Sequence, residues 1–470
     1  MAVESSSIAQ REAVYGLLPV TKAERMWGFL DYTWVNVGLA IATWCFLIGG
    51  TMSLFVGLKA GFATALAGNT VSIILMALAT TIPSCRYGVD QYVGLRSVFG
   101  VHGSKFALLT MIFVEFGWAA VLAIMFGRAY ANVASGLGAV SGVTKPLVVG
   151  LGILAIVVSW LVVWKGPLSI KWLNWVAAPG LVIVLLCMTY FLFRQKSLAE
   201  LLALQPLQPF PDPIWNYVLS FELNLGAGFS WWPVMGGLTR LTTSERAAFW
   251  PNMLGINLAA VLGEMVGLMS ALAIGSSDPT EWMIPLGGAV WGIIALLFVG
   301  FGNVTSITAI VYSTCLALKQ IPLFLRLNWG KLTGGFFAIA AILVFFPDQV
   351  YSHFGTFLAI CGTFFGPLSG IYFVDYFLLR RQRIDVPELY RMRPGATYWF
   401  WGGVNWVAIV SFLAGVVTYF VILNPITFTG QPAFAYLSAS LPSTAVSMLV
   451  YYAAMRLTAV RSGYGGYERR

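Results

Sequence analysis

Long runs of apolar residues, separated by short polar segments, recur along the whole chain. A helix that crosses a lipid bilayer needs about 20 consecutive residues of this kind. Twelve such runs can be marked, at 31–58, 62–84, 104–136, 145–164, 172–193, 214–238, 252–275, 286–318, 332–347, 353–379, 402–423 and 433–456. The pattern therefore predicts an all-α polytopic membrane protein with about 12 transmembrane helices.

The composition supports this prediction and excludes several other classes of protein. Hydrophobic residues make up 59% of the chain and charged residues 10%, whereas soluble domains carry about 25% charged residues. The five cysteines lie far apart, without the close spacing of a zinc site or a disulfide framework. With two histidines and no paired carboxylates near one face, the chain is not expected to be an enzyme or to need a cofactor.

The charge is unevenly distributed between the two sides of the predicted bundle. In a soluble protein, the net charge of +9 would suggest binding to nucleic acid. Here most of the 27 Lys and Arg residues fall in alternate loops and in the two terminal segments. The positive-inside rule then places both termini in the cytoplasm. We expect a multi-pass, monomeric protein of the plasma membrane, in contact with lipid and with no nucleic-acid partner.

Helix-breaking residues cluster in the first and the sixth predicted helices. The first contains Gly38, Gly49 and Gly50, and the sixth contains four glycines and a proline. Breaks at corresponding places in two halves indicate an inverted-repeat transporter whose site lies beside the broken helices. The alternative is that the glycines only allow close helix packing. We predict a five-plus-five inverted repeat with broken helices 1 and 6, followed by two extra C-terminal helices.

These predictions divide the chain into five parts: a cytoplasmic N-terminal segment (1–30), a first repeat (31–193), a second repeat (214–379), the last two helices (402–456) and a cytoplasmic tail (457–470). The end of the tail, from residue 462 onwards, is expected to be disordered.

Two motifs near the end of the second repeat resemble a known family. Residues 366–383 read GPLSGIYFVDYFLLRRQR, and residues 403–406 read GVNW. The pair resembles the nucleobase–cation symporter-1 family, in which a GPL-x-G…DY helix ends in two arginines and a GVNW motif follows. With the order of spans and breaks, the resemblance covers most of the chain.

The resemblance implies a secondary active transporter that imports a nucleobase or related planar nitrogen heterocycle by alternating access. Members of the family carry cytosine, purines, uracil, allantoin, hydantoins or vitamins, driven by sodium or protons. An amino-acid, amine or vitamin transporter on the same fold is the alternative. A channel would instead need rings of polar residues along a pore.

The third predicted helix carries two candidates for substrate binding. Trp118 lies far from both ends of its helix, where interfacial tryptophans are usually found, and family members commonly place an aromatic ring here. Glu115 lies three residues earlier, on the same helix face. An acid inside a span is by default a functional hypothesis. It can accept two N–H bonds from a heterocycle edge, or it can carry a coupling proton.

The sixth helix is expected to provide the opposite aromatic face. Its glycine-rich stretch can unwind and offer backbone groups to a ligand. Alignment on the distal segment at 238–240 (LTR) places the family's second aromatic residue near Gly228 or Phe229. We expect Phe229 to fill this role, with Trp232 as the second choice because it shares the same face of a continuous helix. The alternative is that these rings pack against lipid or a neighbouring helix.

The polar contacts of the site are harder to place. The hydantoin-type pattern has amide side chains where this chain has Leu122 and Ile310. Asn224 and Asn303, together with the acid of the third helix, are therefore the candidates for reading the edge of a substrate. Two further intramembrane acids have structural interpretations: Glu264 as a hydrogen-bonding residue of the bundle interior, and Asp375 as a partner of a nearby arginine.

The resemblance also implies a cation site between the first and eighth helices. A sodium ion needs several hard oxygen ligands, which carbonyls of an unwound helix and nearby hydroxyls can supply. The family pattern maps to the carbonyls of Gly38 and Ile41, the hydroxyls of Thr305 and Ser306, and the carbonyl of Phe301. The alternative is that these hydroxyls only bond to carbonyls of their own helix, with protons as the coupling ion.

Overall fold

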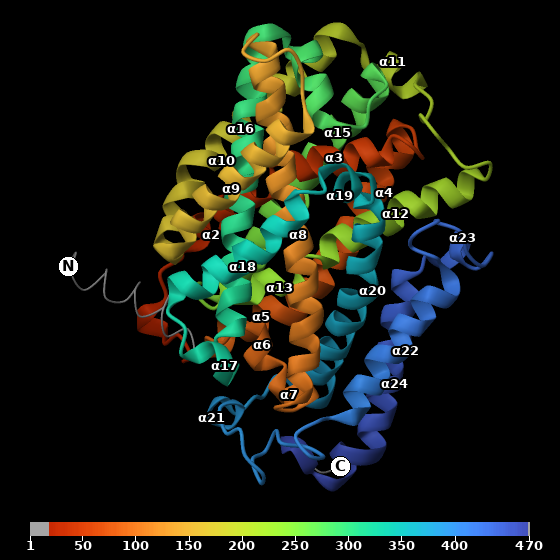
Figure 1. Cartoon of the computed structure of the whole chain (residues 1–470). Helices are drawn as coiled ribbons and strands as arrows, with labels where there is room; N and C mark the ends of the chain where they lie inside the picture. The colour runs from red at the N-terminus through yellow and green to blue at the C-terminus, as the bar shows by residue number, and fades with distance from the viewer. Residues whose placement is uncertain (1–17, 469–470) are drawn as a thin grey trace.

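Each predicted apolar run contains a helix or a broken pair of helices in the computed structural model, which describes residues 18–468 (Figure 1). Within these residues, β pairing is limited to three isolated bridges. The predicted all-α fold is therefore confirmed. Of the predicted N-terminal segment (1–30), residues 1–17 lie outside the described residues.

The helices of the first five spans are α2 (Phe29–Ala40) with α3 (Thr43–Met52), α4 (Leu58–Met76) with α5 (Ile82–Tyr87), α8 (Gly103–Gly136), α9 (Lys145–Trp164) and α10 (Pro167–Gln195). The next five spans contain α12 (Pro213–Phe229) with α13 (Trp232–Thr239), α14 (Glu245–Pro251) with α15 (Ala260–Ile274), α16 (Pro279–Leu318), α18 (Trp329–Val344) and α20 (Phe354–Phe373). The last two spans are α22 (Trp406–Ile422) and α24 (Ser440–Met455). π-Helical turns at Ala77–Thr81 and Asn252–Ala259 join α4 to α5 and α14 to α15, and another extends α20 through Val374–Leu379.

Length and apolar composition mark most of these helices as membrane spans. In the described part of the chain, seven helices can cross a bilayer, or eight if the bent α2–α3 pair is one span. The helices α18 and α22 are apolar but shorter. The expected number of about 12 spans is consistent with this arrangement.

The first helix is broken, as the glycine pattern predicted. Its two parts, α2 and α3, meet at a bend of 52°. Between them, Ile41 and Ala42 leave the helical conformation, and Ala42 is fully extended. The sixth helix is interrupted more mildly. Ser230 and Trp231 separate α12 from α13 while keeping right-handed helical backbone angles.

The two repeats are interleaved in space. The helix α8 packs against α16, α3 against α15, and α4 against α12, so each of these contacts joins one half of the chain to the other. The contact between α3 and α15 requires glycine at position 49, because a Cβ atom there would lie 1.9 Å from the carbonyl oxygen of Glu264. This close packing places the two helix breaks near the centre of the bundle (Figure 1).

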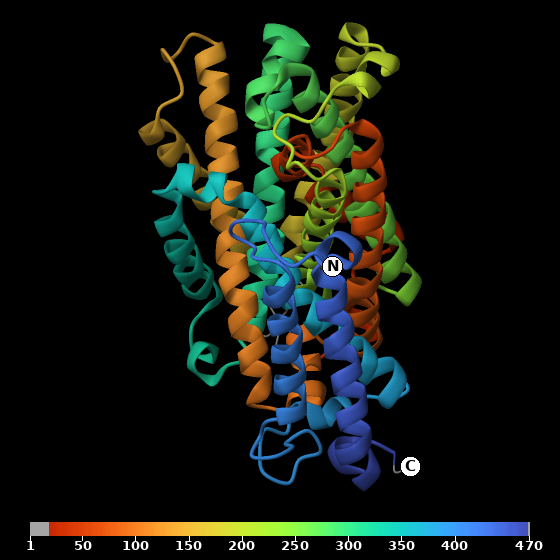
Figure 2. The same cartoon turned by 90° about the vertical axis from the view of Figure 1, so that its right-hand side faces the viewer.

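The last two helices lie side by side at one flank of the molecule, and α24 also packs against α20 (Figure 2). Glu222 of α12 accepts hydrogen bonds from the backbone N–H groups of Ala439 and Ser440, at the start of α24. A carboxylate at a helix N-terminus satisfies unpaired N–H groups and interacts favourably with the helix dipole. Glu222 therefore anchors α24 to the second repeat.

The C-terminal tail does not have the disorder expected from its composition. Residues 462–468 are placed against the bundle, and Tyr467 is buried with its hydroxyl donating to Asp375. Asp375 also pairs with Arg380 at 2.7 Å, as its position in the sequence indicated. The expectation of disorder was wrong for these residues because a single tyrosine gives a glycine-rich segment a side chain to bury.

Candidate functional site

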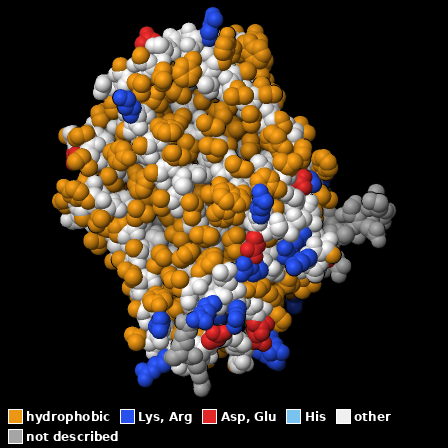
Figure 3. Space-filling view, turned by 180° about the vertical axis from the view of Figure 1, so that it is seen from behind, with side chains coloured by type: hydrophobic (Ala, Val, Ile, Leu, Met, Phe, Trp, Pro, Cys, Tyr) orange, Lys and Arg blue, Asp and Glu red, His pale blue; other side chains and the backbone are white. Residues whose placement is uncertain are grey.

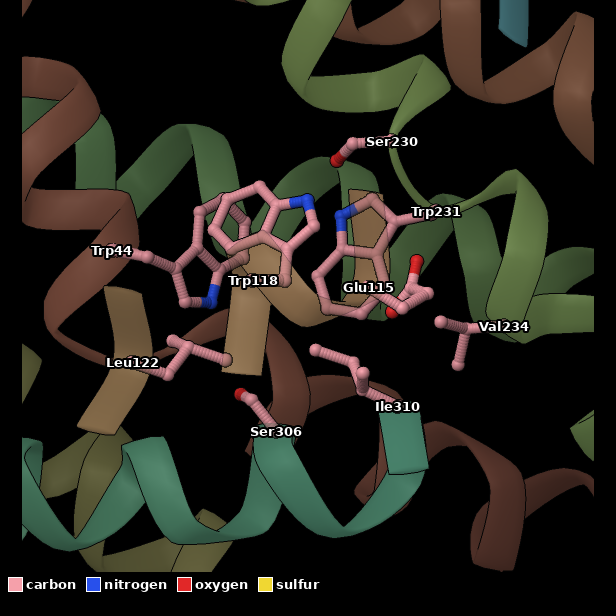
Figure 4. A pocket seen from close by; sticks show the side chains of 9 residues that line it. All are labelled: Trp44, Glu115, Trp118, Leu122, Ser230, Trp231, Val234, Ser306 and Ile310. Carbon is pink, nitrogen blue, oxygen red and sulfur yellow. The ribbon is translucent and has the colours of Figure 1, made fainter. Parts of the chain in front are cut away.

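A narrow cavity of about 10 Å³, roughly the space of one water molecule, lies where the two helix breaks meet α8 and α16. Every side chain that lines it is at most 6% exposed. The lining residues are Trp44, Glu115, Trp118, Leu122, Ser230, Trp231, Val234, Ser306 and Ile310 (Figure 4). The cavity thus draws on α3, α8, the α12–α13 break and α16, which belong to both repeats.

Three tryptophans form the aromatic walls of the cavity. The ring of Trp44 lies edge-on to Trp118, with centroids 6.1 Å apart, and to Trp231, with centroids 5.5 Å apart (Figure 4). The indole N–H of Trp44 donates to the Leu39 carbonyl at 2.9 Å, across the break between α2 and α3. Behind Trp118, the ring of Phe357 in α20 lies 5.2 Å away, edge to face. These contacts hold the rings around the empty space.

Glu115 brings a carboxyl group into this apolar cavity. Its side chain is fully buried, and within residues 18–468 neither carboxyl oxygen has a hydrogen-bond partner. Arg128, the basic residue of the same helix, pairs instead with Asp278 at 2.9 Å and Asp348 at 3.2 Å. A buried polar group without a partner is costly, so the carboxyl is placed to take up a proton or a ligand.

The aromatic residue that the sixth helix contributes to the cavity is Trp231, which the sequence did not single out. Phe229 and Trp232 are fully buried but do not line the cavity. Trp232 stacks on Phe365 of α20, with centroids 6.1 Å apart and planes at 6°. The prediction assumed a continuous helix, and the break at residues 230–231 changes which side chain faces the space.

Trp44 is the second lining tryptophan that sequence reasoning missed. It is the second residue of α3, directly after the break in the first helix. An aromatic residue at that position was the available signal, because side chains beside a helix break are placed to reach a central ligand.

The remaining substrate candidates lie away from the cavity. Gly228 packs tightly against α4, where a Cβ atom would be 2.0 Å from Ser72 Oγ. Asn224 accepts a hydrogen bond from Asn69 at 3.1 Å, and Asn69 also donates to Glu264 at 2.8 Å. This network agrees with the predicted bundle-interior role of Glu264.

The third asparagine candidate, Asn303, donates to the hydroxyl of Thr43 at 2.9 Å, near the start of α3. Leu122 and Ile310, which replace the amides of the hydantoin-type pattern, do line the cavity. The polar side chains at the cavity are thus Glu115, Ser230 and Ser306.

Oxygen atoms of the first and eighth helices converge beside the cavity. Thr305 donates to the Gly38 carbonyl at 2.7 Å, and Ser306 donates to the Leu39 carbonyl at 3.1 Å. Both hydroxyls also lie within hydrogen-bond distance of the Gly302 carbonyl, at 2.6 and 3.4 Å. The Ile41 carbonyl oxygen faces Gly302 as well, 3.0 Å from the point where a Cβ atom would lie.

Four of the five residues predicted for the cation site therefore come together. The eighth-helix carbonyl in this cluster belongs to Gly302 and not to Phe301, which is a shift of one residue. The physical reason is helix geometry: the carbonyl reached from Thr305 is three residues back, and the one reached from Ser306 is four residues back.

Comparisons with known proteins find similar permeases. A family model for permeases of cytosine and purines, uracil, thiamine and allantoin matches residues 19–442. The chain is 25% identical to the purine-uracil permease of Arabidopsis thaliana, covering 85% of this chain and 70% of that protein. It is 24% identical to the hydantoin permease of Microbacterium maritypicum, covering 88% and 85%.

A solved structure supports the fold. The transporter Mhp1 of the nucleobase-cation-symport-1 family, in a closed conformation with bromovinylhydantoin bound, superposes with a TM-score of 0.77 at 20% identity, covering 94% of each chain. The family model spans nearly all of the described helices, including those that form the cavity. The chain therefore belongs to the family of permeases for cytosine and purines, uracil, thiamine and allantoin.

Proposed function

We propose that this permease imports a nucleobase or a related planar nitrogen heterocycle by cation-coupled alternating access. The observation that carries the proposal is the buried cavity lined by three tryptophans and one unpaired carboxyl group. Stacking on an aromatic side chain contributes about 1–3 kcal/mol per base. The cavity volume of about 10 Å³ is far below the roughly 300–1,000 Å³ of sites for drug-sized ligands, so the lining side chains must move apart to admit a ring.

The proposed placement is in the plasma membrane, with both termini in the cytoplasm. Lys and Arg side chains gather at the end of the molecule that carries the C-terminus and the loop after α20 (Figure 3). Positive charge on one side of a bundle favours the cytoplasmic face.

We further propose sodium as the coupling ion, bound by the oxygens of Gly38, Ile41, Gly302, Thr305 and Ser306. These groups are neutral oxygens at a helix break, the kind of ligand that suits a hard cation. Ser306 also lines the cavity, so ion binding and substrate binding share a side chain. The alternative coupling ion is a proton carried by Glu115.

Removing both hydroxyls of the proposed ion site tests the choice of ion. In the variant Thr305→Ala/Ser306→Ala, the sodium concentration needed for half-maximal uptake is expected to rise by at least about tenfold, the scale on which perturbed metal sites lose affinity. Thr314→Ala is the matched control, because the Thr314 hydroxyl bonds within its own helix to Ile310. Uptake into proteoliposomes that responds to an imposed proton gradient but not to sodium would contradict the sodium site.

Variants of two neighbouring tryptophans test whether the cavity is the substrate site. Purified protein is screened by thermal shift against purines, pyrimidines, allantoin, hydantoins, vitamins and amino acids. We expect at least one heterocycle to raise the melting temperature, Trp231→Ala to abolish that shift, and Trp232→Phe to retain it. A shift with amino acids alone would support the alternative transporter class, and a ligand shift that survives Trp231→Ala would contradict the site.

A further inference from the structure

The polar groups of the cavity are mostly hydrogen-bond acceptors. Ser230 uses its hydroxyl hydrogen on the Ala227 carbonyl at 2.6 Å, and Ser306 uses its own on the Leu39 carbonyl at 3.1 Å. A hydroxyl has one hydrogen to donate, so both can offer only lone pairs to a ligand. The indole N–H groups of Trp44 and Trp118 are also engaged, with the Leu39 carbonyl and the Cys361 thiol. Among the lining side chains, Trp231 is left as a source of an N–H donor (Figure 4).

Among residues 18–468, the cavity lining around Glu115 contains no positively charged side chain, and no Asn or Gln. The titratable group that interacts with Glu115 from the neighbouring α20 is the thiol of Cys361, which cannot supply a cation. Three tryptophan faces surround the same space, and such faces attract cations. The environment therefore favours a ligand that brings N–H donors and positive charge.

We propose that the cavity selects heterocycles in which an amino group lies next to a ring nitrogen, as in cytosine, over heterocycles with a carbonyl–N–H–carbonyl edge, as in uracil. This inference rests on the proposed function, and it names the substrate class of the same cavity. The two edges differ in what they present to a carboxyl group, while the rings are nearly equal in size and shape.

The amino-substituted edge complements the carboxyl of Glu115 whichever partner holds the shared proton. A carboxylic acid donates its O–H to the ring nitrogen, while its carbonyl oxygen accepts from the amino group. If the proton moves to the ring nitrogen, the carboxylate accepts two parallel N–H bonds from a cationic ligand, and the total charge of the pair is unchanged. Two charge-assisted bonds of this geometry are stronger than neutral ones.

Uracil cannot form the second of these pairs, in which the ligand carries the proton and the carboxylate accepts two N–H bonds. A carboxylic acid can donate its O–H to a uracil carbonyl and accept the one N–H, which gives two neutral bonds. A carboxylate receives only one hydrogen bond from this edge and faces a carbonyl oxygen with its other oxygen. The carbonyls are too weakly basic to take the proton and become donors. Uracil also brings no positive charge to the three tryptophan rings. The difference between the two ligands thus depends on the carboxyl group and not on the shape of the cavity.

The test compares cytosine and uracil binding to the purified full-length chain by calorimetry, in the wild type and in Glu115→Gln. We expect the wild type to bind cytosine at least about tenfold more tightly than uracil. An amide has one donor and one acceptor, as a neutral carboxylic acid has, and pairs with either edge, so Glu115→Gln is expected to weaken cytosine binding, leave uracil binding close to that of the wild type and bring the ratio close to one.

Two results would overturn the inference: wild-type binding of uracil as tight as that of cytosine, or an unchanged ratio in a folded Glu115→Gln protein. Adenine and hypoxanthine form a second matched pair with the same edges on two rings. If the variant does not fold, the wild-type affinity ratios of cytosine to uracil and of adenine to hypoxanthine still test the proposed selectivity. Failure of all four ligands to bind the wild type would overturn the proposed function itself, which separates the two proposals.

Discussion

Replacing Trp118 with alanine is expected to weaken heterocycle binding by about 10- to 100-fold, the factor that corresponds to about 1–3 kcal/mol of lost stacking. The ring of Trp118 is 5% exposed and lines the cavity together with Glu115, one helical turn away. It is also held edge-on by Trp44 and Phe357. The change removes an aromatic face and loosens the ring that opposes it, and equilibrium binding to purified protein measures the effect.

Two control variants separate stacking from folding. Trp118→Phe keeps an aromatic face and is expected to retain most of the affinity. Trp172→Ala alters a tryptophan of α10 that is 63% exposed, and it is expected to leave binding unchanged. If Trp118→Ala binds the ligand as tightly as wild type while eluting as a folded protein, the aromatic cavity is not the substrate site.

The largest loss of stability is expected from Asp375→Ala. The ion pair between Asp375 and Arg380 is almost fully buried, with side-chain exposures of 0% and 1%. Removing one partner of a buried pair leaves an uncompensated charge, which costs about 3–5 kcal/mol. Tyr451 and Tyr467 also donate to Asp375, so α24 and the tail lose these two hydrogen bonds to the end of α20. We expect a large fall in apparent melting temperature.

The matched control is Glu468→Ala at the surface of the same end. Glu468 pairs with Arg383, and both side chains are more than half exposed. Exposed pairs contribute about 0–1 kcal/mol, so the melting temperature is expected to stay close to that of the wild type. Equal melting temperatures for the two variants would show that the buried pair does not hold this end of the molecule together.

The sequence predicted the helices well because long apolar runs leave the backbone few alternatives in a membrane. It also predicted that Glu115 and Trp118 would project from the same helix face, and both line the cavity, because both lie on one regular helix whose period fixes which side chains share a face. The convergence of Gly38 and Ile41 with Thr305 and Ser306 followed from the family resemblance.

The failures concentrate at the helix breaks. Trp231 and Trp44 were missed because helical periodicity does not apply across residues 230–231 or 41–42. For the eighth helix, the prediction chose the carbonyl of Phe301, whereas the two hydroxyls contact that of Gly302. The reason is related, because the register of this helix cannot be fixed without its partner helix. Composition alone also could not show that Tyr467 would be buried.

The central claim is that this permease concentrates a planar heterocycle by using a cation gradient. The most direct measurement is uptake of the radiolabelled heterocycle that stabilises the protein most, into proteoliposomes with an imposed inward sodium gradient. The wild type is expected to accumulate the compound above its equilibrium level. Uptake by the Trp118→Ala variant is expected to be close to that of protein-free liposomes. If folded wild-type protein gives no more uptake than protein-free liposomes for every heterocycle that binds it, under either a sodium or a proton gradient, the claim is contradicted.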